Sequence, residues 1–115
     1  MPRMTLTRPL LAFACLALAA PATRADGFVM GAGRWSCAEV LAGVDGGDTV
    51  LVGQTAGWVL GWWSAATFSR ETRFVDIVEE VGGSGIWDRT VAECRTAPPD
   101  TPLYLVVTSM ISNTK

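Results

Sequence analysis

The chain has 115 residues, with nine basic residues, eleven acidic residues and no histidine, and half of its residues are hydrophobic. A chain of this length forms a single domain. The absence of histidine removes the commonest general base and the usual zinc ligand, and the acidic balance argues against nucleic acids and anionic membrane surfaces as partners. We therefore expect no enzyme, no catalytic residue, no metal site and no cofactor.

The N-terminal segment has the pattern of a secretory signal peptide. Arg3 and Arg8 provide its basic region, and an apolar run follows from Leu10 to Ala20. Small residues then mark cleavage after Ala22 or after Ala25. This pattern predicts export to the periplasm, and a retained N-terminal anchor is the alternative interpretation.

Removal of residues 1–25 leaves residues 26–115 as one domain, with six basic and eleven acidic residues and a formal charge of −5. Cys37 and Cys94 are the two cysteines of this domain, because Cys15 lies within the signal peptide. Two cysteines in an exported domain are expected to pair. A disulfide that closes a loop of this size contributes about 4 kcal/mol in the chain-entropy model. A redox-active pair is not favoured, because the C-x-x-C spacing is absent.

The domain is expected to begin with a mobile, glycine-containing lead-in over residues 26–34. A short helix follows, with Ser36 as its N-cap and Glu39 at the spacing of a capping box. Its inner stripe consists of Cys37, Val40, Leu41 and Val44. A glycine-containing turn ends this helix, and Asp48 or Thr49 can cap the next one.

The stretch from Val50 to Phe68 contains no charged residue and three of the five tryptophans. A helix that is apolar on nearly all sides is buried in a protein core or in a bilayer. We favour a central core helix over a transmembrane span or an exposed binding face, because polar residues such as Gln54 dilute the apolarity and no basic cluster flanks the stretch. Small residues at every fourth position form a ridge that another backbone can approach closely: Gly53, Gly57, Gly61 and Ala65.

Two further helical patterns follow the central stretch. The first runs from Phe74 to Val81, and the second runs from Ile86 to Arg95 after a flexible break at residues 82–85. The side chains of the second pattern that are expected to face inward are Trp87, Val91 and Cys94.

A last helix is expected from Leu103 to Ile111, with Asp100 or Thr101 as its cap and Pro102 at its first position. The competing interpretation of this segment is a β-strand, because three of its residues have strand propensity: Val106, Val107 and Ile111. Taken together, the patterns predict an all-α fold, a small bundle of four to five helices around one apolar central helix, closed by one disulfide.

The tryptophans are the side chains best suited to bind a partner. Trp58 and Trp62 are four residues apart and are expected to stack on one side of the central helix. Trp35 and Trp63 are expected to be partly exposed, so these four tryptophans form a candidate apolar binding face. Core filling is the competing interpretation, and the one favoured for so small a domain.

Three short motifs resemble those of the HdeA/HdeB-like family of small periplasmic helical proteins with one disulfide. They are Trp35-Ser36-Cys37 at the front, Gly57-Trp58 in the central helix and Val91-Ala92-Glu93-Cys94 near the end. The continuation from Cys94 to Pro98, followed by a final helix, is similar to that of the Tai-type immunity proteins, which neutralise type VI secretion effectors. The chain departs from the lysine-rich acid chaperones of the family, since Lys115 is its only lysine.

The resemblance predicts a periplasmic acid-stress chaperone that exposes apolar surface when its carboxylates are protonated near pH 4. Protonation of all eleven carboxylates would change the side-chain charge of residues 26–115 from −5 to +6. The alternative is an immunity or inhibitor-type interaction protein that binds one cognate partner at neutral pH. The expected partners are therefore proteins, either unfolded clients or a single partner, and a homodimer stays open. No stable membrane span is expected in the processed chain.

Overall fold

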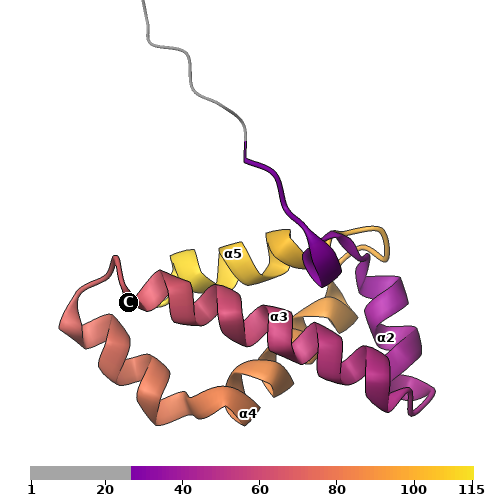
Figure 1. Cartoon of the computed structure of the whole chain (residues 1–115), viewed down its shortest axis with the longest axis horizontal. Coiled ribbons are helices and arrows are strands. Elements are labelled where there is room, and N and C mark those ends of the chain that lie inside the picture. Colours follow the sequence, from indigo (N-terminus) through magenta and orange to yellow (C-terminus); the bar gives the residue numbers. More distant parts are fainter. Residues whose placement is uncertain (1–26) are drawn as a thin grey trace, which may run out of the picture.

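The computed structural model describes residues 27–115, and this part of the chain is all-α, with no strand (Figure 1). The predicted signal peptide, both predicted cleavage sites and Cys15 lie outside the described residues. The elements are one short 3-10 helix and four α-helices: η1 (Gly31–Arg34), α2 (Cys37–Asp45), α3 (Thr49–Thr67), α4 (Thr72–Thr96) and α5 (Leu103–Asn113).

α2 begins with the predicted capping box. Ser36 Oγ accepts a hydrogen bond from the Glu39 amide, and Glu39 Oε2 accepts one from the Ser36 amide, both at 3.1 Å. Asp48 caps α3, because its Oδ1 accepts a hydrogen bond from the Leu51 amide at 3.1 Å. These amides have no partner within their helices, so the caps set where both helices begin.

α3 is the central helix of the bundle and contacts η1, α2, α4 and α5. In Figure 1 it runs along the domain, with α2 at its N-terminal end, α5 above it and α4 below it. Its inward side chains Val59 and Trp63 are buried. The expectation that this helix is buried on nearly all sides is wrong for its outer side, because no other element of residues 27–115 covers it.

α4 is longer than either of the two helices expected in this region. Its backbone leaves helical geometry only at Gly82, with φ 73° and ψ 171°, and the helix resumes at Gly83. The expected flexible break over residues 82–85 is therefore a kink at one residue. Glycine is the residue that adopts this φ and ψ without strain.

The side of the second half that faces inward also differs from the expected one. The fully or almost fully buried residues there are Ile86, Thr90 and Cys94. Trp87 and Val91, which were expected to face inward, are only partly buried. The Thr90 hydroxyl is satisfied inside the core, because it donates a hydrogen bond to the Ile86 carbonyl oxygen at 2.7 Å.

The connection before α5 lies against the start of α2. The Cys37 amide donates to the Thr101 carbonyl oxygen at 2.9 Å, and the Leu103 amide donates to the Trp35 carbonyl oxygen at 2.8 Å. α5 begins at Leu103, and Pro102 is its N-cap rather than its first helical residue as expected. The competing strand interpretation of this segment is wrong, since tertiary packing buries one side of a helix here.

The lead-in is ordered from the start of η1, in contrast to the mobile segment that was expected. Ala32 and Gly33 are buried, and the Trp58 indole lies directly on Gly33, where any side chain would collide with the ring. Glycine at this position is therefore required by the packing of a tryptophan that lies 25 residues further along the chain.

The predicted disulfide joins Cys37 of α2 to Cys94 of α4, with their Cα atoms 5.1 Å apart. Both cysteines are buried, so the bridge is part of the core. All four α-helices contribute to this core, which consists of Cys37, Val40, Val59, Trp63, Phe74, Ile86, Cys94, Leu103, Val106 and Val107. The fold therefore confirms the predicted helical bundle with a central helix and one disulfide.

Candidate functional site

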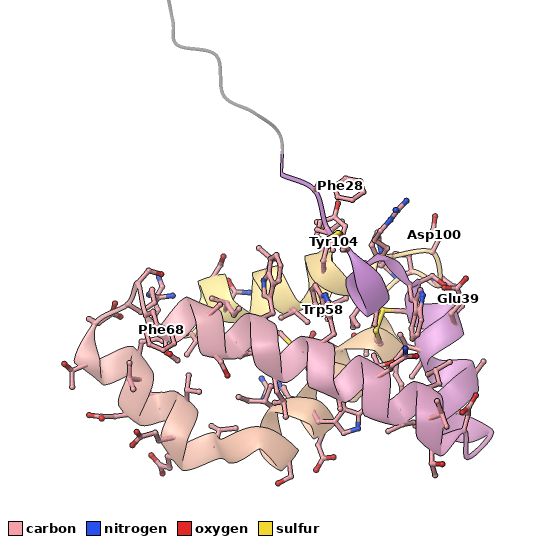
Figure 2. All side chains as sticks on the ribbon, viewed as in Figure 1. Phe28, Glu39, Trp58, Phe68, Asp100 and Tyr104 are labelled. Carbon is pink, nitrogen blue, oxygen red and sulfur yellow. A yellow bond between two sulfur atoms is a disulfide. The ribbon has the colours of Figure 1, made fainter. Side chains whose placement is uncertain are left out.

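Two tryptophans of α3 stack at the edge of its outer side. The ring centroids of Trp58 and Trp62 are 4.9 Å apart, with 18° between the ring planes. Trp58 is held from the other side, because its Nε1 donates a hydrogen bond to the Met30 carbonyl oxygen at 2.9 Å. Figure 2 shows Trp58 beside η1, in the middle of α3, and Phe68 at the C-terminal end of α3. Trp62 keeps 38% of its surface exposed. The stack therefore has a fixed position, in which Trp58 is held by its hydrogen bond and Trp62 is accessible to a partner.

The outer side of α3 consists mainly of small and apolar residues, with the exposed polar residues Gln54 and Ser64 among them. We call this surface the α3 face and define it by five exposed residues: Val50, Gly53, Gly57, Gly61 and Ala65. A Cβ atom added at any of its three glycines would have no neighbouring heavy atom within 4 Å. The chain carries no charge between Asp48 and Arg70, so the α3 face is uncharged along its whole length.

The other two tryptophans of the expected binding face lie elsewhere. Trp35 is half-buried beside the disulfide-linked start of α2, and Trp63 retains only 5% of its surface. Trp63 stacks on Phe74 of α4, with the ring centroids 5.9 Å apart. The partial exposure expected of Trp63 is therefore wrong, because the first half of α4 covers it. Its Nε1 is buried and has no hydrogen-bond partner among residues 27–115.

One ion pair joins two helices of the bundle. Arg95 of α4 donates to both carboxylate oxygens of Asp45 on α2, at 2.7 and 3.2 Å. These hydrogen bonds hold the pKa of Asp45 below its ordinary value and raise the pKa of Arg95. The pKa of Glu71 is also lowered. The larger cause is a hydrogen bond with its own backbone, and the second is a hydrogen bond from Arg70. These groups are exposed, so the pairs are screened by solvent and salt.

A groove of about 820 Å³ lies between α4 and α5, with Trp63 as the one residue of α3 that lines it. Its apolar walls come from both halves of α4 and from α5: Ile77, Val78, Val81, Ile86, Leu105, Val106 and Met110. The sequence patterns did not predict this groove. It depends on the bend at Gly82, and residues 82–85 were interpreted as a flexible break.

Among residues 27–115, no group of three or more cysteine and acidic side chains is placed to hold a metal ion. No helix in the same part of the chain is long and apolar enough to cross a membrane. No family model matches the chain, and neither curated proteins nor solved structures give a match. The resemblance to the HdeA/HdeB-like family therefore stays a prediction.

Proposed function

We propose that this protein is an interaction protein that binds one protein partner at neutral pH through the α3 face. The observation that supports this proposal is that the face is open and uncharged in the folded chain. Glycine in a helix interior costs about 1 kcal/mol relative to alanine. No contact within residues 27–115 requires Gly53, Gly57 or Gly61, since each has free space beside it. A partner that approaches the backbone closely would explain why these positions lack side chains.

The chemistry of the surrounding side chains also fits a protein partner. Small residues on one side of a helix let a second helix pack at short distance, and tryptophan is enriched among the residues that dominate binding energy. Trp62 lies beside the α3 face and is held by its stack on Trp58. A fixed aromatic side chain loses little conformational entropy on binding, which favours affinity.

A substitution that blocks the face without damaging the helix tests the proposal. Gly57→Arg places a long charged side chain on the α3 face, and arginine has a higher helix propensity than glycine. We expect the variant to remain folded and to lose a stoichiometric partner that the unmodified protein retains from extracts of the cells that produce it. Ser84→Arg, on exposed α4 surface, is the matched control and should retain the partner. Equal retention by both variants would contradict the proposal.

A second copy of the chain is one partner that the α3 face permits. Light scattering after size-exclusion chromatography, over a range of protein concentrations, distinguishes a homodimer from a monomer. If a dimer forms, Gly57→Arg should dissociate it and Ser84→Arg should not. A monomer at all concentrations would restrict the proposal to a different protein partner.

The acid-stress chaperone is a second candidate, and one specific observation favours it. Carboxylates hold the helices at three places: Glu39 caps α2, Asp48 caps α3, and Asp45 joins α2 to Arg95 of α4. Arg95 holds the pKa of Asp45 below its ordinary value, so protonation of Asp45 breaks the ion pair between α2 and α4 only at strongly acidic pH, while the disulfide remains. Tryptophan fluorescence and client aggregation, followed from pH 7 to pH 2, test this candidate. A red shift with suppressed aggregation supports it, and an unchanged spectrum without protection contradicts it.

The periplasm remains the proposed location, on the basis of the signal-peptide pattern. Mass spectrometry of the exported protein should find an N-terminus at Asp26 or at Thr23, which correspond to cleavage after Ala25 and after Ala22. An intact Met1 in a membrane fraction would favour the retained anchor instead.

A further inference from the structure

The groove between α4 and α5 is a second surface that is suited to binding. It shares no residue with the α3 face, so failure of the proposed function would leave the inference below unaffected. Its volume is about 820 Å³.

The kink of α4 brings the two halves of this helix to one groove. Val81 precedes the bend at Gly82, and Gly85 and Ile86 follow it on the groove wall. A Cβ atom at Gly85 would lie 2.8 Å from Val81 Cγ1. Glycine at this position therefore leaves room for the Val81 side chain at the bend.

The groove is open along apolar edges. Val81 of α4 has 48% of its surface exposed and Leu105 of α5 has 47%, although both are large hydrophobic residues. Ile86 and Val106 lie deeper and are buried. An open apolar groove between two helices is the geometry that accepts the apolar side of a further helix.

The charged residues of the groove indicate the charge of its occupant. Arg89 Nε lies 3.5 Å from Glu93 Oε1, so these two charges compensate each other. Asp88, on the same wall, forms no ion pair within the part of the chain that the structure describes. The groove therefore presents one uncompensated negative charge, on a chain whose residues 26–115 have a formal charge of −5. A basic side chain beside the apolar side of the occupant would complement it.

We infer that the α4–α5 groove binds an amphipathic helical segment of a partner protein, with leucine-like side chains on one side and a lysine or arginine that pairs with Asp88. The leucine-like side chains fill the apolar wall between Val81 and Leu105. The basic residue determines the orientation of the segment and discriminates against acidic helices.

Two synthetic helices test this inference by isothermal titration calorimetry with the oxidised protein at neutral pH. One helix is made of leucine and lysine, and the other has glutamate in place of every lysine. We expect saturable binding of one leucine–lysine helix per chain and at least tenfold weaker binding of the leucine–glutamate helix. No saturable binding of the leucine–lysine helix, or equal affinity for both helices, would overturn the inference.

Matched variants place the binding in the groove. Ser109→Trp fills the groove from α5, whereas Ser112→Trp places the same side chain on exposed α5 surface outside it. We expect the first to weaken binding of the leucine–lysine helix at least tenfold and the second to leave it unchanged. An equal effect of both variants would overturn the inference, provided that circular dichroism shows both to be folded.

A second pair of variants tests the role of Asp88. Asp88→Lys should weaken binding of the leucine–lysine helix about tenfold, as for the loss of one close charge pair, and should improve binding of the leucine–glutamate helix. Asp76→Lys makes the same charge change on exposed α4 surface outside the groove and should affect both affinities much less. Equal effects of the two charge reversals would show that net charge alone selects the helix and would overturn the assignment to Asp88.

Discussion

The two halves of α4 are held in the bundle in different ways. The half after Gly82 is joined to α2 by the disulfide between Cys94 and Cys37. Arg95, one residue further along, adds an ion pair with Asp45 of α2 at 2.7 Å. The second half is therefore attached to a neighbouring helix by a covalent bond and by charge.

The first half of α4 depends mainly on one aromatic side chain. Phe74 is fully buried and stacks on Trp63. The Arg70 guanidinium lies over the Phe74 ring, 4.0 Å from the ring centre. Ile77 and Val78 are only partly buried, and Val81 is about half exposed. The cation–π contact adds to the stack, since a guanidinium is attracted to the face of an aromatic ring.

The comparison predicts that the two halves of α4 differ in local stability. Segments with few buried contacts open at lower free energy than the segments that carry the core. Because Gly82 separates the two halves and the disulfide lies in the second, we expect the first half to open without displacing the disulfide. Opening of this half would uncover Trp63 and remove Ile77, Val78 and Val81 from the wall of the groove between α4 and α5.

Removal of the Phe74 side chain should have the largest effect on the difference in stability between the two halves of α4. Phe74→Ala is expected to lower the free energy of unfolding by roughly 3–5 kcal/mol, as for other buried phenylalanines. Hydrogen exchange should accelerate most strongly in residues 72–81. Phe68→Ala is the matched control, because Phe68 is 91% exposed and its removal should change stability little. Uniform acceleration over both halves of α4 would contradict this difference in stability.

Removal of the disulfide should lower the stability of the second half of α4. Replacement of both Cys37 and Cys94 by serine is expected to cost roughly 2–5 kcal/mol of stability, because the unfolded chain regains the freedom of the closed loop. Urea unfolding measures the loss, and hydrogen exchange should accelerate in α2 and in residues 83–96. Reduction of the unmodified protein should reproduce the effect. Acceleration of hydrogen exchange confined to residues 72–81 would contradict the prediction that the disulfide holds the second half of α4.

The kink itself can be tested with two glycines that differ in backbone conformation. Neither Gly82 nor Gly53 has a heavy atom within 4 Å of an added Cβ, but only Gly82 has a positive φ, 73°. Gly82→Ala should destabilise the protein by roughly 1–3 kcal/mol through backbone strain. Gly53→Ala should stabilise it by roughly 0.5–1 kcal/mol through helix propensity. Thermal unfolding measures both, and equal effects would show that the kink is not a strained position.

The smallest expected effect concerns the ion pair of the second half. The pKa of Asp45 is lowered in the folded chain by Arg95, so this carboxylate stabilises the fold above its ordinary pKa of about 3.9. That stability is lost as the pH falls through the lowered pKa. Asp45→Asn should therefore reduce the pH dependence of the unfolding midpoint slightly below pH 5. Identical pH profiles of the native protein and Asp45→Asn would contradict this role.

Local sequence patterns predicted the parts of the candidate site that depend on spacing along one helix. Trp58 and Trp62 stack as their separation of four residues indicates, and the uncharged stretch forms a single helix. The burial of Trp63 was not predicted, because it depends on how the first half of α4 lies across α3. The groove was missed for the same reason, since it requires two helices and a bend.

The sequence by itself determined the all-α class, the caps of α2 and α3 and the cysteine pair, because each depends on neighbouring residues or on the limited choice among the two cysteines of residues 27–115. The Ser36–Glu39 capping box and the Asp48 cap form as the spacing predicts. Only the tertiary structure decided that the ridge of small residues on α3 faces outward and that Trp58 orders the lead-in by packing on Gly33. Periodicity identifies the sides of a helix, but the positions of the other helices decide which side is covered.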